Sequence, residues 1–246
     1  MVKNPSAWLA TPTSLEISSV AIDVWRCPLD QTTNQIDASS KCLSAQERQR
    51  AEQFRFVGKR EQFVTTRARL RRCLALATGI RADKIEIEVS ATGKPFLAGQ
   101  MLASGIQFNV SHTDGLALIA ITRGQAVGID IEALRRSIQH VRLAENYFSS
   151  KEKNVIAALP SEQVPASFFA CWTRKEAVLK AIGTGIALGL DSFDVATEPD
   201  ITHCRTELQS AHGPSKTWCV DTLPCGAGFV GALAYHKQPV EIRYWY

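Results

Sequence analysis

Val127-Gly128-Ile129-Asp130-Ile131-Glu132 alternates apolar residues with small or acidic ones along its whole length. Such alternation predicts a β-strand that buries one row of side chains and presents the other row on the opposite face. Asp130 and Glu132 then share a face, about 7 Å apart at a rise of about 3.3 Å per residue. That separation suits two oxygen ligands of one hard cation, so this strand is a candidate for part of a metal site.

A second stretch, residues 172–180, reads Trp-Thr-Arg-Lys-Glu-Ala-Val-Leu-Lys. A spacing of four places Trp172, Glu176 and Lys180 along one face of a helix, with Lys175 about 100° away around the axis. A third carboxylate and two ammonium groups could therefore converge on a metal-bound phosphate.

Each motif has a simpler interpretation when it is taken alone. Asp-x-Glu at a strand end is usually a solvated edge or a salt-bridge partner, and such surface pairs contribute little. Lys-Glu-x-x-x-Lys on a helix usually pairs surface charges four residues apart. The two motifs occur in one chain, and this conjunction favours a shared site.

The combined pattern resembles the signature of the Sfp-type 4'-phosphopantetheinyl transferases. That signature has Gly-Ile-Asp, here residues 128–130, followed after an interval by the pattern seen at 172–180. Three further motifs occur in the family's order: Gly93-Lys94-Pro95, Phe108-Asn109-Val110-Ser111-His112 and Leu190-Asp191-Ser192-Phe193. The resemblance therefore covers roughly residues 44–195.

The resemblance implies an α+β fold of two similar α/β halves related by pseudo-twofold symmetry, with coenzyme A in the cleft between them and Mg²⁺ on its pyrophosphate. The implied enzyme transfers the 4'-phosphopantetheine group of coenzyme A to a serine hydroxyl of an apo acyl or peptidyl carrier protein and releases 3',5'-ADP. Such carriers serve fatty-acid, polyketide or nonribosomal peptide biosynthesis. Two similar halves in one chain suggest that a monomer suffices.

The resemblance also implies residue roles. The expected Mg²⁺ ligands are Asp130, Glu132 and Glu176. Glu176 is the first choice to accept the serine proton, and a metal-bound water held by Glu132 is the alternative. The expected catalytic set is Asp130, Glu176, Lys175 and His112, and the expected contacts to coenzyme A come from Arg60, Arg67, Lys94, Pro95, Ser111, His112, Lys175 and Lys180.

Two arginines of a helix expected from about Arg60 to Ala77 are candidates for the 3'-phosphate and adenine side of coenzyme A, where the family uses basic residues. Arg67 interrupts the apolar stripe of this helix, and a charge there needs a partner such as a phosphate. Arg60 lies near the helix start, where free N–H groups favour an anion. The other arginines of this region are most simply solvated or paired with acids, or they dock an acidic carrier protein.

Lys94 and His112 would be unremarkable without the family motifs. Gly-Lys-Pro is ordinarily a turn with an exposed lysine, and the chain lacks the P-loop pattern. His112 lies at the end of an expected strand before the Asp114-Gly115 hairpin turn, where a lone histidine is more often structural.

Periodicity predicts further elements. The hairpin over 106–122 leads directly into the strand that carries Asp130 and Glu132. This short connection predicts two domains, 1–124 and 125–246. The remaining expectations are a loop over 28–42, helices that begin near Ser44, Ser149 and Pro165, and strands over 17–26, 192–196, 217–221, 228–235 and 240–246.

The composition is that of an ordinary globular protein: 246 residues, 45% hydrophobic and 21% charged, with net charge +4. There is no apolar run of about 20 residues, no secretory signal and no Cys-x-x-Cys pair among seven cysteines, which favours a cytoplasmic protein without a membrane partner. Arginines and lysines crowd residues 48–72, which leaves a basic nucleic-acid-binding module as an alternative, beside a non-catalytic coenzyme A or nucleotide-binding protein. Neither alternative explains why three carboxylates occur in these motifs. We therefore prefer the transferase and expect no nucleic-acid partner.

Overall fold

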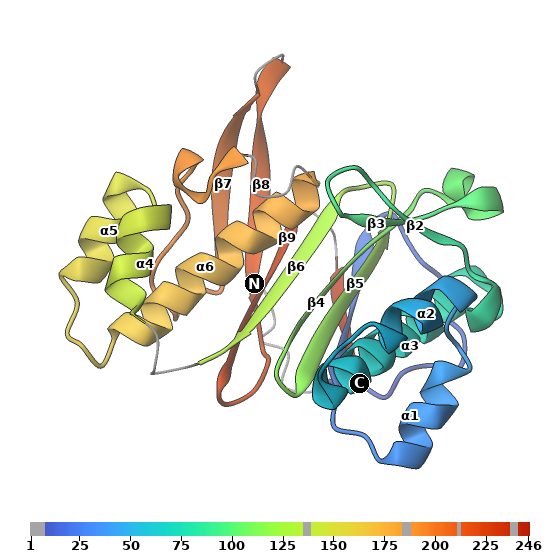
Figure 1. The fold of residues 1–246 in the computed structure, drawn as a ribbon. Helices are drawn as coiled ribbons and strands as arrows, with labels where there is room; N and C mark the ends of the chain where they lie inside the picture. Colours follow the sequence, from blue (N-terminus) through green and yellow to red (C-terminus); the bar gives the residue numbers. More distant parts are fainter. Residues whose placement is uncertain (1–7, 135–138, 184–187, 211–212, 237–240) are drawn as a thin grey trace. The chain divides into compact units, whose positions relative to one another are not determined.

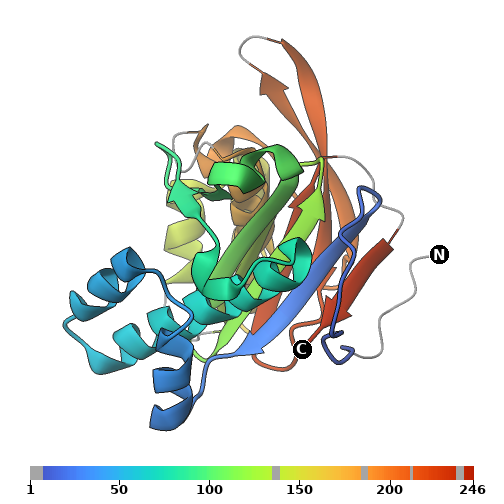
Figure 2. The same ribbon diagram turned by 90° about the vertical axis from the view of Figure 1, so that its right-hand side faces the viewer.

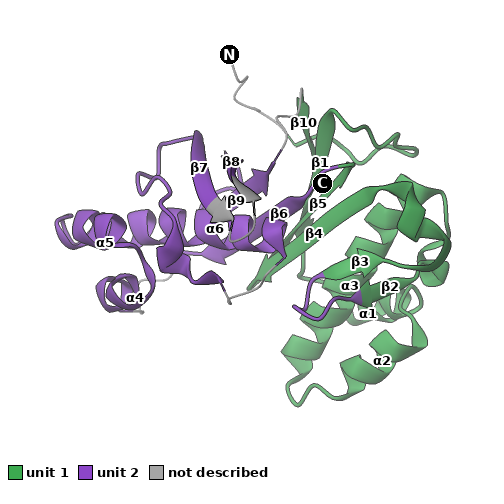
Figure 3. Cartoon of the chain, turned by 90° about the horizontal axis from the view of Figure 1, so that it is seen from above, with its two compact units in different colours: residues 1–88, 95–124, 240–246 green, residues 89–94, 125–239 purple. Residues whose placement is uncertain are grey.

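The computed structural model describes residues 8–134, 139–183, 188–210, 213–236 and 241–246. The chain divides into two compact units (Figure 3). Unit 1 comprises Met1–Glu88, Pro95–Gly124 and Val240–Tyr246, and unit 2 comprises Val89–Lys94 and Gln125–Pro239. Dividing the chain only once, into 1–124 and 125–246, is therefore wrong at two places, because the C-terminal strand joins unit 1 and the turn at 89–94 joins unit 2.

Unit 1 is built on a four-stranded sheet in the order β10-β1-β5-β4, whose strands are labelled in Figure 3. The hairpin of β4 (Ile106–Thr113) and β5 (Leu116–Arg123) has the turn predicted at Asp114-Gly115. β1 (Ala21–Pro28) lies antiparallel to β5, and β10 (Glu241–Trp245) lies parallel to β1, beside it in Figure 2. The last strand of the chain thus completes the first unit.

The described part of unit 1 also contains three α-helices and a small sheet. α3 (Val57–Thr78) packs on the four-stranded sheet through buried residues such as Leu70 and Leu74. α2 (Ala45–Glu52) begins at the predicted capping box. The loop predicted over 28–42 is wrong, because α1 (Thr33–Ser40) forms there with its own capping box in a polar sequence. The small sheet pairs β2 (Ile87–Val89) with β3 (Pro95–Leu97).

Unit 2 has an antiparallel sheet in the order β6-β9-β8-β7, with α6 (Val164–Ile182) along β6 and β9 (Figure 1). The predicted strand over 192–196 is wrong, because residues 190–192 form a 3₁₀ turn and the following residues lie outside the sheet. β7, which was not predicted, lies at one edge of this sheet. The other elements are β6 (Val127–Ala133), α4 (His140–Tyr147), α5 (Ser150–Ala157), β7 (His203–Ser210), β8 (Gly213–Leu223) and β9 (Phe229–Tyr235).

Gly128 allows α6 to lie very close to β6. A Cβ atom at this position would be 2.0 Å from the carbonyl oxygen of Ala177 and 2.3 Å from the nitrogen of Ala181. Only glycine leaves room for this approach, which brings the acidic face of β6 to the polar side chains of α6. None of the helices in the described part of the chain has the length and apolarity needed to span a bilayer.

Candidate active site

The acidic strand β6 places its two carboxylates differently with respect to solvent. Asp130 is 3% exposed, whereas Glu132, two residues further along, is half-buried. Both residues face antiparallel partners on β9, Asp130 opposite Ala232 and Glu132 opposite Val230. Asp130 therefore needs compensation for its buried charge, and α6 provides it.

Lys180 and Glu176, one turn apart on α6, meet Asp130. Nζ of Lys180 lies 2.5 Å from Oδ1 of Asp130. The pKa of Glu176 is raised above its ordinary value, first by burial and then by repulsion from Asp130, while Lys180 opposes the shift. The mutual repulsion means that the two carboxylates share one electrostatic environment.

The donor set suits Mg²⁺ only in part. Among the residues that the structure describes, no group of three or more His, Cys, Asp or Glu side chains is arranged to hold a metal ion. The predicted cage of Asp130, Glu132 and Glu176 is therefore not assembled. Asp130 and Glu176 still match the chemistry, because Mg²⁺ usually needs only one or two carboxylates beside substrate phosphates and water. A divalent cation would also relieve the repulsion that raises the pKa of Glu176.

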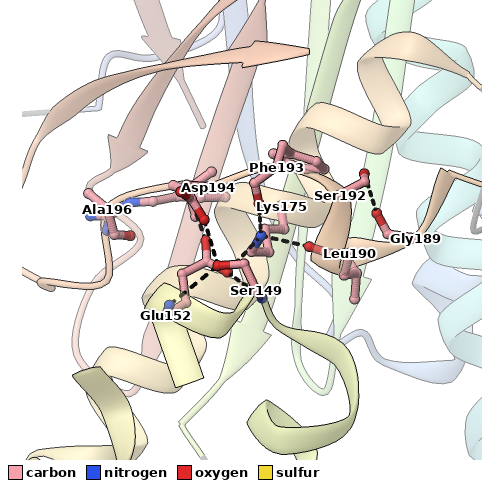
Figure 4. Close-up of polar contacts among 11 residues, drawn as sticks. Ser149, Glu152, Lys175, Gly189, Leu190, Ser192, Phe193, Asp194 and Ala196 are labelled. Atoms are coloured by element: carbon pink, nitrogen blue, oxygen red, sulfur yellow. Dashed lines mark hydrogen bonds and ion pairs between the residues drawn. The ribbon is translucent and has the colours of Figure 1, made fainter. Parts of the chain in front are cut away.

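Lys175 does not join this cluster. It is fully buried, and its ammonium group lies 2.8 Å from a carboxylate oxygen of Glu152 (Figure 4). It also donates hydrogen bonds to the carbonyl oxygens of Leu190, at 2.6 Å, and Phe193. All three N–H donors of Lys175 are used inside the protein, so the expected contact with phosphate stays a prediction that these partners do not support.

Lys94 is likewise bound to protein atoms. Nζ of Lys94 donates to the carbonyl oxygens of Ala181, at 3.0 Å, and Val127, at 3.2 Å. Burial lowers the pKa of Lys94 to about 8. Its neighbour Thr92 donates to the carbonyl oxygen of Gly183, at 2.5 Å. The turn that carries Lys94 thus lies at the C-terminal end of α6, where backbone carbonyl groups favour a cation. The contact between Lys94 and the nucleotide stays a prediction.

Three further predicted contacts to coenzyme A lie on strands of unit 1. Ser111 and His112 are adjacent on β4 and point to opposite faces, so Ser111 is buried and His112 is exposed. Pro95 is the first residue of β3. These positions stay predictions for cofactor binding.

Arg67 has an internal partner. Its guanidinium lies 3.2 Å from Glu47, which also binds the buried Arg71 at 2.6 Å and caps α2 through the backbone nitrogen of Ser44 at 2.8 Å. The partner that the charge of Arg67 was expected to need is thus supplied by Glu47 within the protein, and its contact with coenzyme A stays a prediction. Arg60 is exposed in the first turns of α3 and stays a prediction.

Sequence reasoning missed the second role of Glu47 and Glu152. Each was visible only as the acidic residue of a helix capping box, a local signal at the starts of α2 and α5. Each carboxylate also binds a buried cation far along the chain. No local pattern shows such a contact.

Comparison with known proteins decides the family. A family model described as the 4'-phosphopantetheinyl transferase superfamily matches residues 126–234, and one described as 4'-phosphopantetheinyl transferase, N-terminal, matches residues 28–123. The chain is 37% identical over 239 residues to the 4'-phosphopantetheinyl transferase HetI of Nostoc sp. (strain PCC 7120 / SAG 25.82 / UTEX 2576), which covers 97% of this chain and 98% of that protein. The chain belongs to the 4'-phosphopantetheinyl transferase superfamily.

Other members of the 4'-phosphopantetheinyl transferase superfamily match over shorter stretches. The 4'-phosphopantetheinyl transferase Sfp of Bacillus subtilis (strain 168) is 33% identical over 143 residues, 56% of this chain and 61% of that protein. The L-aminoadipate-semialdehyde dehydrogenase-phosphopantetheinyl transferase of Xenopus laevis is 30% identical over 168 residues, 65% of this chain and 56% of that protein. The family predicted from the motifs is confirmed, and the chain is a transferase.

Proposed function

We propose that this transferase moves the 4'-phosphopantetheine group of coenzyme A to a serine hydroxyl of an apo carrier protein in a Mg²⁺-dependent reaction that releases 3',5'-ADP. The observation that carries the proposal is the cluster of Asp130, Glu176 and Lys180, which combines two mutually repelling carboxylates with one ammonium group. Phosphoryl transfer is catalysed mainly by positioning and by neutralising oxygen charge, and these side chains can do both.

Asp130 and Glu176 would hold the metal ion, and Mg²⁺ bound there would neutralise charge on the diphosphate. Lys180, whose side chain is 30% exposed, can turn from Asp130 to a phosphate oxygen, and His112 is a second candidate donor. A bond forms between the serine oxygen and the β-phosphorus of coenzyme A, and the bond from that phosphorus to the oxygen bridging to the 3',5'-ADP leaving group breaks.

Glu176 is the proposed acceptor of the serine proton. Burial is the largest cause of the raised pKa of Glu176, and a raised pKa makes a carboxylate a stronger base than an ordinary glutamate. A metal ion bound to Glu176 would lower this pKa and weaken the base. A water molecule held by Glu132 is the alternative route for the proton. Exchange of Glu132 for glutamine would leave the rate unchanged if Glu176 accepts the proton alone.

The finer architecture is also part of the proposal. We propose two halves related by pseudo-twofold symmetry, with coenzyme A between them and Arg60, Pro95, Ser111 and His112 on its nucleotide and phosphate side. Support comes from the construction of each unit, which places a capping-box helix before a long helix that packs on a four-stranded sheet. A single chain would then form a complete site as a monomer.

The test is incubation with fluorescent coenzyme A, Mg²⁺ and a panel of apo acyl and peptidyl carrier proteins. We expect labelled carrier and one 3',5'-ADP per label, both lost on addition of EDTA and both abolished in Asp130→Asn. Binding of coenzyme A without release of 3',5'-ADP from any carrier would instead identify a non-catalytic coenzyme A-binding protein and refute the proposal.

A further inference from the structure

The buried ion pair of Glu152 and Lys175 has no place in the proposed reaction, although Lys175 directly precedes Glu176. Glu152 is 1% exposed and Lys175 0%. Lys175 reaches Glu152, Leu190 and Phe193, and Figure 4 shows these groups converging on its nitrogen. An ammonium group has three N–H donors, so all of them are engaged.

Glu152 is engaged just as fully and joins three parts of unit 2. One carboxylate oxygen accepts from the backbone nitrogen of Ser149, at 3.0 Å, and from Lys175. The other oxygen accepts from the backbone nitrogen of Val195, at 2.7 Å. The ion pair therefore ties the start of α5 and the middle of α6 to the segment after α6. Most partners of the pair are backbone atoms, so it links the backbone at the start of α5 to the backbone of the segment after α6.

Unit 1 contains the same construction around another buried cation. Glu47 caps α2 and binds Arg71, which is 2% exposed and lies on the long helix α3. Arg71 in turn donates to the carbonyl oxygens of Ala82, at 2.7 Å, and Ile85, at 3.0 Å, in the segment after that helix. A capping glutamate, a buried cation in a long helix and two carbonyl groups beyond the helix thus recur in both units.

The two versions differ in the residue that follows the cation. Arg72 follows Arg71 in unit 1, whereas Glu176 follows Lys175 in unit 2. Successive side chains of a helix are about 100° apart around its axis, so a fixed Lys175 also fixes the direction in which Glu176 points. Arg71 has no such neighbour to orient.

We infer that Lys175 is a positioning residue whose ion pair with Glu152 fixes the rotation of α6 and so holds Glu176 beside Asp130. Lys175 acts on the reaction through Glu176 and makes no contact with phosphate. The inference rests on the proposed function only in that it concerns the same two carboxylates.

The experiment compares Lys175→Met, Glu152→Gln and the double variant with the wild type. Arg71→Met is the matched control, because it removes the equivalent cation from unit 1. The readouts are the thermal midpoint, the dissociation constant of Mn²⁺ alone by calorimetry, and kcat and KM for coenzyme A. If Lys175→Met and Glu152→Gln fail to fold, Glu152→Asp keeps the charge and shortens its reach by one methylene.

We expect each single variant, and Glu152→Asp to a smaller degree, to lower kcat by about 100-fold, the cost of a displacement of about 1 Å in a catalytic group. Mn²⁺ should bind about tenfold more weakly, with KM for coenzyme A unchanged within about twofold. The double variant should lose no more kcat or Mn²⁺ affinity than either single variant, because every one of these variants breaks the same ion pair. Arg71→Met should lose thermal stability but keep its Mn²⁺ affinity and kcat.

Two results would overturn the inference. Glu152→Gln could transfer at the wild-type rate while Lys175→Met raises KM for coenzyme A, which would make Lys175 a phosphate ligand. Arg71→Met could weaken Mn²⁺ binding as much as Lys175→Met, which would make the effect one of general destabilisation. A wild type that loads no carrier would refute the proposed function alone, since Mn²⁺ binding still distinguishes Lys175→Met from Arg71→Met.

Discussion

Lys180 of α6 and Asp130 of β6 form an ion pair with 2.5 Å between Nζ and Oδ1. The carboxylate is buried, whereas the lysine side chain is 30% exposed and can move. Glu176, one helical turn before Lys180, is repelled by the same aspartate. Repulsion between the two carboxylates therefore lowers the stability of the folded protein, and this loss of stability can be measured.

Exchange of Glu176 for glutamine should stabilise the metal-free protein at pH 7 while abolishing transfer. The raised pKa means that ionised Glu176 costs free energy in the folded state, and this cost appears as pH rises through the folded pKa. We expect the thermal midpoint of Glu176→Gln in EDTA to be higher than that of the wild type. The gain should vanish as pH falls below 4.5, the ordinary pKa, where the carboxyl is neutral in both states.

Scanning calorimetry from pH 4 to 8 would test this, with the exposed Glu145→Gln on α4 as the control that leaves the midpoint unchanged. A lower midpoint for Glu176→Gln at pH 7 would show that the folded protein stabilises ionised Glu176, which would contradict the raised pKa of this residue.

Exchange of Gly128 for alanine should damage both stability and activity. The added Cβ would meet backbone atoms of Ala177 and Ala181, which cannot turn away as a side chain could. α6 would be forced away from β6, at a cost of about 1–3 kcal/mol for overpacking, and Glu176 would move away from Asp130. Urea unfolding and the transfer rate measure the two effects. Gly58→Ala on α3 is the control, since nothing lies within 4 Å of its Cβ, and wild-type behaviour of Gly128→Ala would contradict the close packing.

Removal of Glu47 should destabilise unit 1 strongly. Glu47→Ala leaves the buried Arg71 without a carboxylate, and breaking one side of a buried pair costs about 3–5 kcal/mol. The capping hydrogen bond to Ser44 is lost as well. Urea unfolding is the measurement, and the exposed Glu52→Ala on the same helix is the control, expected within about 0.5 kcal/mol of wild type. Equal stability of the two variants would mean that Arg71 finds another partner.

Lys94 should make folding pH-dependent in the alkaline range. Its pKa is lowered from 10.5 to about 8, so between these values the unfolded chain binds more protons than the folded one. Stability relative to Lys94→Met should therefore rise with pH across this window and level off beyond it. The midpoint difference between wild type and Lys94→Met, measured from pH 7.5 to 11, tests this. A difference that stays constant, as expected for the exposed Lys84→Met, would show that the Lys94 ammonium is not desolvated.

Local patterns in the sequence predicted the elements that build the site. The alternation in β6, the four-residue spacing of Glu176 and Lys180, and the stop at Gly183 are properties of neighbouring residues. Strand and helix geometry dictate which side chains share a face, whereas the approach of Asp130 to α6 was expected only from the family signature that joins the two motifs. The family motif added the chemistry.

The same reasoning failed where a partner is distant along the chain. β10 joins unit 1 because Asp23, fully buried on β1, accepts hydrogen bonds from Arg243 at 2.6 and 2.8 Å and from Trp245 at 2.8 Å. Periodicity predicted a strand at 240–246 but contains no information on which sheet it enters.

The order of residues was thus enough to name the transferase superfamily and the strand and helix that carry Asp130, Glu176 and Lys180. The folded chain alone decided that Lys175 faces Glu152 and that Arg67 faces Glu47. A charge in a sequence can be matched to many partners, and the partner is chosen by which groups folding buries together. Because an unpaired buried charge costs much free energy, the folded state keeps these pairs together.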